Sequence, residues 1–363
     1  MSRLRYFLWP LLLPISLLYA CVTSFRNLLF DIGWLKSKAF GVKVIVVGNL
    51  SVGGTGKSPM IEWLISRLGQ SYKIATLSRG YGRTTKGFRY VETHTLASEV
   101  GDEPKQFKQK FETIVVAVAE DRVVGIAQIC KDHPEVDLVL LDDAFQHRWV
   151  RPMLSIVLTD FSKPFTKDWP LPLGRLREWR TGVKRANWVV VTKCPTVLGL
   201  AAQSEMRHEL ARCTKAPIYF SRIQFGELQP LQNLGDFDGF GWLGGQKKGG
   251  IVAFCGIANP KSFFDFLLPF FEQNECVSFA DHHLFEPKDL VLLKQKWDLL
   301  KVEDKLMITT EKDAQRLNEL MDRLGNENPL KGLPICYLPI ETCLLNEENN
   351  KFELAIREML TSK

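Results

Sequence analysis

The sequence predicts an α/β protein with a mainly parallel sheet, a second and smaller α/β domain, and a membrane-associated helix at the N-terminus. Three observations support this prediction. Strand-like apolar runs alternate with helical stretches, glycine-rich turns gather near residues 224–250, and an uncharged leucine-rich run precedes the first strand. Hydrophobic residues make up 45% of the 363 residues, which suffices for a packed core.

The leucine-rich run extends from Phe7 to Phe25 and has arginines on both sides. Its length approaches that of a spanning helix, but Pro10 and Pro14 would kink it, so crossing the membrane and lying on its surface both stay open. A cleaved signal peptide is less consistent with the sequence, because it contains no clear small-residue cleavage site. A hydrophobic hairpin buried in the core is a further alternative. We expect residues 1–30 to form an uncleaved membrane anchor.

The first predicted strand, Val44–Val47, leads into a glycine-rich loop and then a helical pattern. The glycines let backbone N–H groups curl around an anion, Lys57 supplies a positive charge, and Ser58 supplies a hydroxyl for Mg²⁺. A turn without a ligand, which is the alternative, would need neither of these side chains. The residues predicted to bind the phosphates of a nucleotide are Ser51, Val52, Gly53, Gly54, Thr55, Gly56, Lys57 and Ser58, with Ser51 in place of the usual first glycine.

Further strand-like runs follow this phosphate-binding loop, with helical or irregular stretches between most of them. The alternation predicts a P-loop NTPase-like core domain over residues 31–225. Ligands on such sheets bind beyond the carboxyl ends of the strands, so we expect functional residues directly after each run. The runs cover residues 73–78, 114–118, 136–141, 154–158, 188–192 and 218–220.

Turn signals over residues 226–250 predict a junction between two domains. Residues 251–363 then show a second alternation of strands and helices, with a strand over 251–255 and a terminal helix from Phe352. This segment has no second phosphate-binding loop. We therefore expect a smaller C-terminal α/β domain over residues 251–363.

The strand that covers residues 136–141 ends in two carboxylates, Asp142 and Asp143. An acidic strand end is the usual companion of a phosphate-binding loop, where it places a carboxylate near the Mg²⁺ ion. Paired aspartates also occur as ordinary strand-end caps, but the loop upstream favours metal binding at Ser58, Asp142 and Asp143. Gln146 and His147 belong to the same loop.

Asp102 and Glu103 lie on a turn between a glycine and a proline, where a rigid backbone can aim a carboxylate at a hydroxyl. Such turns are more often simple surface turns. A histidine partner would support a catalytic role for this carboxylate, and His282 and His283 are the candidates. No zinc-ligand spacing accompanies these histidines, so a structural or general-base role is favoured over metal binding.

Basic residues are concentrated between Arg175 and Arg185, in a loop with glycine and tryptophan. One guanidinium group can bind two phosphoryl oxygens at once, although such a loop is more often a solvated or lipid-facing surface.

The composition gives less specific information about ligands. The net charge of +6 does not distinguish between a phosphorylated ligand, an anionic membrane and nucleic acid. The eight cysteines form no C-x-x-C pair, which argues against a zinc ribbon or a disulfide scaffold. Pro195 replaces the aspartate of a guanine-recognition element, so we expect ATP rather than GTP.

In this order the motifs resemble the tetraacyldisaccharide 4′-kinases of lipid A biosynthesis, over almost the whole chain. Ala144 and Ser58 stand where the family usually has glycine and threonine, and Ser51 is typical of the family. The segments that carry the resemblance are the N-terminal apolar run, Val47–Pro59, Leu77–Arg83, Gly101–Pro104, Asp142–His147, Leu176–Glu178, Asp281–His282 and Thr310–Asp313.

The resemblance implies an enzyme that uses ATP and Mg²⁺ to phosphorylate the 4′-hydroxyl of tetraacyldisaccharide 1-phosphate, giving lipid IVA. It implies a location at the cytoplasmic face of the bacterial inner membrane, in contact with lipids of the inner leaflet. It implies no nucleic-acid partner, and no obligate protein partner is inferred. A membrane-associated P-loop ATPase with a regulatory or assembly role, which would hydrolyse ATP without a lipid acceptor, is the alternative.

The resemblance also implies roles for individual residues. Asp102 is the catalytic base, paired with His282, and Arg177 stabilises charge on the transferred phosphoryl group. Lys57 and Ser58 contact the phosphates and the metal. Residues with weaker implied roles at the substrate are Tyr81, Glu103, Arg122, Gln146 and His147. The resemblance implies no role for His283, Glu311 or Asp313.

Overall fold

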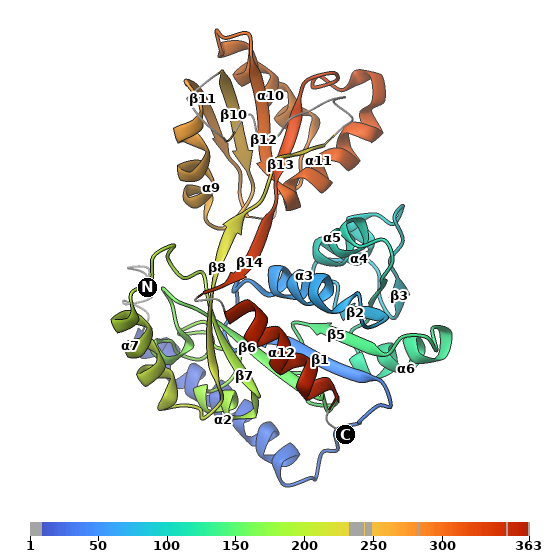
Figure 1. The fold of residues 1–363 in the computed structure, drawn as a ribbon, viewed down its shortest axis with the longest axis vertical. Helices are drawn as coiled ribbons and strands as arrows, with labels where there is room; N and C mark the ends of the chain where they lie inside the picture. The colour runs from blue at the N-terminus through green and yellow to red at the C-terminus, as the bar shows by residue number, and fades with distance from the viewer. Residues whose placement is uncertain (1–8, 232–242, 244–248, 282, 346–347, 362–363) are drawn as a thin grey trace. The chain divides into compact units, whose positions relative to one another are not determined.

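The structure is a computed structural model that describes residues 9–231, 243, 249–281, 283–345 and 348–361. The chain divides into two compact units, each with its own sheet and core (Figure 1). Unit 1 contains residues 1–224 and 341–363, and unit 2 contains residues 225–340. The expected α/β fold with a mainly parallel sheet is confirmed.

Unit 1 is built on a sheet whose nine described strands follow the order β14-β8-β7-β6-β1-β5-β2-β4-β3. The strands from β4 to β8 pair in parallel, and β3 pairs antiparallel with β4. The strands are β1 Lys43–Asn49, β2 Ile74–Ser78, β3 Arg89–Tyr90, β4 Val115–Val118, β5 Leu138–Asp142, β6 Leu154–Asp160, β7 Trp188–Thr192, β8 Ile218–Phe225 and β14 Ile340–Leu344.

The central strand β1 sends alternate side chains into two hydrophobic clusters on opposite faces of the sheet. Val44 and Val46 pack in the cluster that includes α6 and α7, whereas Ile45 and Val47 pack in the cluster that includes α3 and α12. Because both faces are covered, the strand reads as an unbroken apolar run. The helices of this unit after α2 are α3 Lys57–Leu68, α4 Ala97–Val100, α5 Asp102–Lys110, α6 Arg122–Asp132, η1 Phe165–Lys167, η2 Arg180–Arg185, α7 Leu200–Ala211 and α12 Glu348–Thr361.

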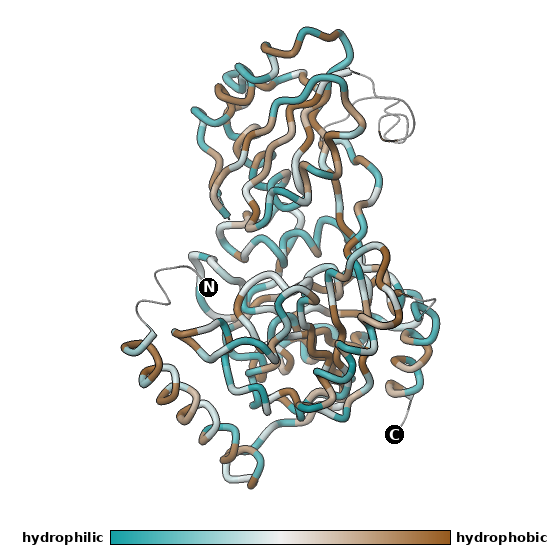
Figure 2. Tube along the Cα trace, turned by 90° about the vertical axis from the view of Figure 1, so that its left-hand side faces the viewer, coloured by the Kyte–Doolittle hydropathy of each residue, from teal (hydrophilic) through white to brown (hydrophobic). Residues whose placement is uncertain are grey.

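The N-terminal apolar run forms one helix, α2, Trp9–Asp31, which is long and apolar enough to cross a membrane by length and composition. Its inward face includes Ser16, Ala20 and Phe30, which are buried at helical spacing. Apolar stretches recur along the helix in Figure 2, and most of its large apolar side chains are exposed. The run therefore does not form a hairpin buried in the core. The exposed apolar residues of α2 are Trp9, Leu11, Ile15, Leu17, Leu18, Val22, Phe25 and Leu28.

Unit 2 has a smaller sheet with the order β11-β10-β12-β13-β9, parallel except for β9. Helices alternate with its parallel strands, as the sequence pattern predicts. The elements are β9 Gln229–Pro230, β10 Gly250–Cys255, α9 Pro260–Leu267, η3 Leu268–Phe270, β11 Gln273–Ser278, α10 Pro287–Leu299, β12 Lys305–Thr310, α11 Glu311–Leu324, η4 Gly325–Glu327 and β13 Ile335–Leu338.

The end of the chain differs from the division expected from the sequence, which placed residues 251–363 in one domain. Residues 341–363 belong to unit 1, where β14 joins the edge of the large sheet. The helix α12 buries Phe352, Ile356 and Leu360 in the cluster that also contains α3. Helical periodicity shows which face of α12 is apolar, but it cannot show which sheet that face covers.

Phe352 provides a test of this packing, because it is fully buried and its ring lies 5.4 Å from Trp63, 5.3 Å from Trp188 and 4.6 Å from Tyr219. We expect Phe352→Ala to lower the free energy of unfolding by about 3–5 kcal/mol, measured by tryptophan fluorescence during denaturation. The control is Leu354→Ala on the same helix, where the side chain is 58% exposed and the expected change is within about 0.5 kcal/mol. Equal effects of the two substitutions would contradict this packing of α12.

Candidate active site

The phosphate-binding loop lies between β1 and α3 and is held from two sides. Asn49 donates a side-chain hydrogen bond to the Thr55 hydroxyl at 2.8 Å, and the Thr192 hydroxyl donates to the Thr55 carbonyl oxygen at 2.8 Å. On the other side, the N–H of Val52 donates to the carbonyl of Arg175 at 2.8 Å. The N–H of Arg177 donates to the carbonyl of Leu50 at 2.7 Å. The loop is therefore ordered by neighbouring segments.

The helix α3 begins directly after this loop, with Lys57 and Ser58 as its first residues. Its N-cap is Gly56, whose φ of 84° lies in the left-handed region that glycine adopts at low cost. In the part of the chain that the structure describes, no side chain caps this helix end, and its first turn has no acidic residue. The free N–H groups and the positive end of the helix dipole form an anion-binding site.

The two carboxylates after β5 lie next to the loop and differ in their contacts. Asp142 pairs in register with Val47 of β1 and is 6% exposed. Asp143 accepts two hydrogen bonds from the Arg177 guanidinium, at 2.6 and 2.9 Å, and lies 3.7 Å from the Lys57 ammonium. Burial disfavours ionisation of Asp143, but the charges of Lys57 and Arg177 outweigh it and lower its pKa below the ordinary value. Asp143 is therefore ionised at neutral pH.

Ser58 and Asp142 have the chemistry of a magnesium site. Mg²⁺ prefers oxygen ligands and usually keeps several water and phosphate ligands, so one hydroxyl and one carboxylate suffice from the protein. Both oxygens of Asp143 accept hydrogen bonds from Arg177, and Asp142 supplies a second carboxylate at the end of β5. The described residues contain no cluster of three or more histidine, cysteine, aspartate and glutamate side chains suited to a metal.

Arg122 and His147 place buried polar groups near these carboxylates. Burial lowers the pKa of Arg122 to about 10, against the opposing charges of Asp142 and Asp143, so this arginine stays charged at neutral pH. Burial, followed by the charge of Arg122, lowers the pKa of His147 to about 4. The imidazole of His147 is therefore neutral at neutral pH. Gln146 donates hydrogen bonds to the Asn49 carbonyl at 2.9 Å and to Glu178 at 3.0 Å.

The loop after β2 and the turn before α5 approach each other closely. A Cβ added at Gly80 would lie 2.6 Å from the carbonyl oxygen of Val100, and one added at Gly101 would lie 3.1 Å from that of Tyr81. Only glycine permits this contact at both positions, where φ is 70° and 96°. The side chain of Tyr81 on this loop is 80% exposed.

Asp102 and Glu103 form the first turn of α5. Since α5 ends at Lys110 and β4 begins at Val115, the start of α5 lies toward the carboxyl edge of the sheet, as the phosphate-binding loop does. His282 lies outside the described residues and its segment belongs to unit 2, so its pairing with Asp102 stays a prediction.

Three residues without a role in the sequence analysis have structural contacts in unit 2. His283 lies 2.8 Å from the carboxylate of Asp289. Asp313 is fully buried, and its carboxylate accepts hydrogen bonds from the N–H of Gly256 at 2.9 Å and from the Thr310 hydroxyl at 2.6 Å. Glu311 is 9% exposed and begins α11.

A family model described as Tetraacyldisaccharide-1-P 4'-kinase matches residues 8–361 of the chain. This chain belongs to that family. The match confirms the resemblance on which the sequence-based assignment rests.

Relatives and a solved structure agree with the family assignment. The Tetraacyldisaccharide 4'-kinase of Flavobacterium psychrophilum is 41% identical over 356 residues, which cover 96% of each chain. That of Bacteroides thetaiotaomicron is 41% identical over 352 residues, covering 94% of this chain and 90% of the relative. A crystal structure of "apo" form LpxK from Aquifex aeolicus in complex with ATP has a TM-score of 0.73 and 27% identity, and covers 98% of this chain and 99% of that one.

Sequence reasoning missed several side chains that hold the phosphate-binding loop in this family member. Asn49 is the last residue of β1 and Thr192 is the last residue of β7. The expectation that functional residues lie at strand ends could therefore have identified both. Lys193 contacts the carbonyl of Gly54 and lies 3.3 Å from Asp160, although the sequence showed it only as part of an incomplete guanine-recognition element. Asp143 and Lys193 are the described non-glycine residues with positive φ, and backbone strain of this kind clusters at functional sites.

His147 gives a prediction about pH. Its pKa of about 4 is below the ordinary 6.5, so between these values the unfolded chain binds more protons than the folded one. The free energy of unfolding should therefore fall as the pH drops from about 6.5 to 4. We expect His147→Gln to make the loss of stability between pH 7 and pH 5 smaller than in the wild type. An NMR titration midpoint of the His147 imidazole near 6.5 would contradict the assigned environment.

Proposed function

We propose that this protein transfers the γ-phosphoryl group of ATP to the 4′-hydroxyl of tetraacyldisaccharide 1-phosphate. The observation that carries the proposal is the arrangement of Lys57, Arg177 and the Asp142–Asp143 pair around an uncapped helix end, in a chain of the tetraacyldisaccharide 4′-kinase family. Phosphoryl transfer depends mainly on positioning and charge neutralisation, which this arrangement supplies.

The nucleotide phosphates bind at the start of α3. The N–H groups of residues 53–58 and the ammonium of Lys57 face the β- and γ-phosphates, in the manner of other phosphate-binding loops. Ser58 and Asp142 would hold Mg²⁺, which would supply positive charge against that of the phosphates. Arg177 stabilises the negative charge that develops on the transferred group, and Asp143 holds its guanidinium in place.

Asp102 acts as the general base in this proposal. Its carboxylate takes the proton of the attacking hydroxyl while the new oxygen–phosphorus bond forms, and the bond between the γ-phosphorus and the bridging oxygen breaks to release ADP. Support comes from the position of Asp102 on the first turn of α5, toward the edge of the sheet where the phosphate-binding loop lies. His282 is the proposed partner that orients Asp102. Tyr81 and Glu103 are proposed to contact the acceptor.

The helix α2 is proposed to attach the protein to the cytoplasmic face of the bacterial inner membrane. Its contacts with the rest of unit 1 extend from Ser16 to Asp31, so protein covers one side of the helix along most of its length. The opposite side exposes Leu11, Ile15 and Leu18 at helical spacing. A helix with one protein-covered face and one apolar face suits immersion along the membrane surface better than a full crossing.

Replacing the proposed base tests the reaction. We expect Asp102→Asn to lower kcat by about a hundredfold or more, because proton transfer by a positioned side chain contributes roughly 10²–10⁴. ATP binding should stay close to that of the wild type. The measurement is transfer of labelled phosphate from ATP to the glycolipid at saturating substrates. Glu112→Gln, on an exposed residue just beyond α5, is the control.

Two results would count against the assignment. Weakened ATP binding with unchanged turnover at saturation would remove the role of Asp102 as base. ATP hydrolysis by the wild type without transfer of label to any glycolipid would favour the regulatory or assembly ATPase over the kinase.

Charge on the outward face of α2 tests the membrane proposal. We expect the double substitution Leu18→Asp and Val22→Asp to reduce flotation with anionic phospholipid vesicles severalfold, since binding at the membrane surface depends on burying this apolar face and on electrostatic attraction to anionic lipid. These side chains are 66% and 60% exposed, so folding should be little affected. The control is Leu354→Asp on α12, where the side chain is 58% exposed. Unchanged flotation of the double variant would exclude this face as the attachment surface.

A further inference from the structure

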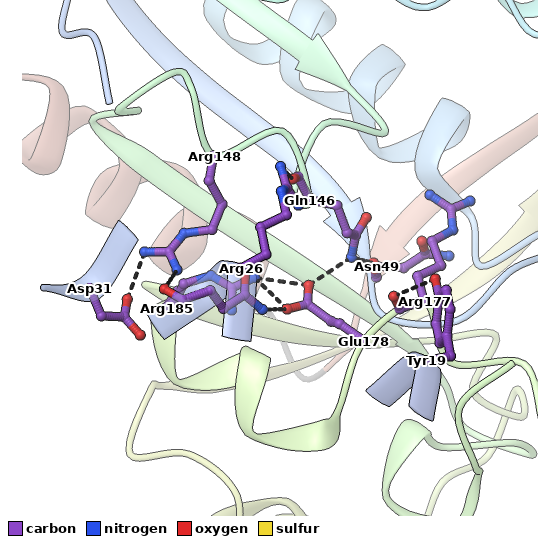
Figure 3. A network of polar contacts seen from close by, with 10 residues as sticks. Tyr19, Arg26, Asp31, Asn49, Gln146, Arg148, Arg177, Glu178 and Arg185 are labelled. Carbon is purple, nitrogen blue, oxygen red and sulfur yellow. Dashed lines mark hydrogen bonds and ion pairs between the residues drawn. The ribbon is translucent and has the colours of Figure 1, made fainter. Parts of the chain in front are cut away.

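Glu178 lies at the centre of a polar network between α2 and the phosphate-binding loop (Figure 3). The residue is 2% exposed. Both of its carboxylate oxygens accept hydrogen bonds from the Arg185 guanidinium at 2.8 Å, and Gln146 donates a third at 3.0 Å. Asn27 of α2 donates a fourth at 2.7 Å. One buried carboxylate therefore joins the helix α2, the loop after β5 and the helix η2.

Through this network α2 reaches the phosphate-binding loop by a short chain of hydrogen bonds. Asn27 donates to Glu178, and Gln146 donates both to Glu178 and to the carbonyl of Asn49, the last residue of β1. Arg26 of α2 also donates to the carbonyl of Gln146 at 3.2 Å. A shift of α2 would therefore change the hydrogen bonds at the start of the loop.

A second chain of contacts runs through Arg177. Tyr19 of α2 donates its hydroxyl hydrogen to the carbonyl of Arg177 at 2.8 Å. The N–H of the same residue bonds to Leu50 in the loop, and its guanidinium holds Asp143. Arg177 and Glu178 are neighbours in the chain, so both routes end on one short segment. This segment has contacts with α2 on one side and with the phosphate-binding loop on the other.

A membrane anchor does not need these contacts. Attachment to lipid requires the apolar outward face, whereas Tyr19, Arg26 and Asn27 all make polar contacts with the rest of unit 1. Buried hydrogen bonds to a charged group fix geometry closely, because leaving one unmade is costly. The inward face of α2 therefore makes polar contacts that attachment to lipid does not require.

We propose that Glu178 is a positioning residue that couples the docking of α2 to the geometry of Arg177 and the phosphate-binding loop. The proposal rests on the proposed kinase function. The reaction then requires α2 to be packed against the rest of unit 1. Phosphoryl transfer depends on this helix even in an assay where membrane attachment does not limit the rate.

The test compares four variants of the full chain in detergent micelles that also contain the glycolipid, so that membrane recruitment does not limit the rate. Glu178→Gln keeps the shape of the side chain and removes its charge. Tyr19→Phe removes one hydrogen bond. The matched control is Thr23→Val, because among the described residues the Thr23 hydroxyl bonds only to carbonyls of α2 itself, at 3.0 and 3.1 Å. The double variant E178Q/N27D exchanges the carboxylate and the amide between the two positions.

We expect Glu178→Gln to lower kcat at least about tenfold, since small misplacements of reacting groups cost one to two orders of magnitude. Tyr19→Phe should lower kcat about threefold to tenfold, the effect of one lost hydrogen bond. Thr23→Val should match the wild type, and E178Q/N27D should recover part of the kcat lost in E178Q. Flotation with vesicles and the unfolding temperature should stay near wild-type values for Tyr19→Phe.

Two results would overturn the coupling. The first is a wild-type kcat and wild-type ATP affinity in both E178Q and Y19F. The second is a loss of activity in Y19F that merely follows a loss of folded protein or of vesicle binding. Failure of the proposed function is separate, because it would show as no label transfer by the wild type. The coupling would then be judged by ATP affinity alone, which E178Q should weaken and T23V should not.

Discussion

The contact between Asp143, Arg177 and Lys57 organises the nucleotide side of unit 1. Lys57 and Arg177 come from different segments, and their positive charges repel each other where both side chains approach Asp143. A third cationic side chain, Arg122, is buried nearby. The ionised carboxylate of Asp143 offsets this repulsion and sets the direction of the Arg177 fork. Asp143 has a positive φ of 49°, and its carboxylate lies 3.7 Å from the ammonium of Lys57. Positive charge is thus held in place before a phosphate arrives, which is the condition for efficient electrostatic stabilisation.

The same segment connects this charge cluster to the N-terminal helix. Residues 175–177 pair with the phosphate-binding loop through backbone hydrogen bonds, and Glu178 follows directly. The helix α2 combines an apolar outward face with an inward face that contacts this segment. An enzyme with a lipid-borne acceptor needs its catalytic groups at a defined height above the membrane. A helix that contacts both the lipid and residues 175–178 would set this height.

In unit 2 the motif at residues 310–313 has a structural explanation. Thr310 caps α11 by accepting a hydrogen bond from the N–H of Asp313, and the buried Asp313 carboxylate bonds back to Thr310 and to Gly256. Arg316 lies 3.7 Å from Asp313 and donates to the carbonyl of His283 at 3.2 Å. These contacts link the start of α11 to the segment beside His282. A motif that resembles a simple helix cap in the sequence therefore also orders a loop.

The sequence by itself determined the α/β class, the phosphate-binding loop and the acidic strand end, because these depend on local pattern and on residue types adjacent in the chain. The parallel sheet then brings strand ends together, so the approach of an acidic strand end, here Asp143, to Lys57 was predictable. Only the tertiary structure decided that Arg177 holds Asp143 and that Tyr19 and Asn27 of an apolar helix contact Arg177 and Glu178. It also decided that α12 returns to the first sheet. These contacts join residues more than 30 positions apart, and the side-chain partners of such pairs are set by packing, which leaves no periodic trace in the sequence.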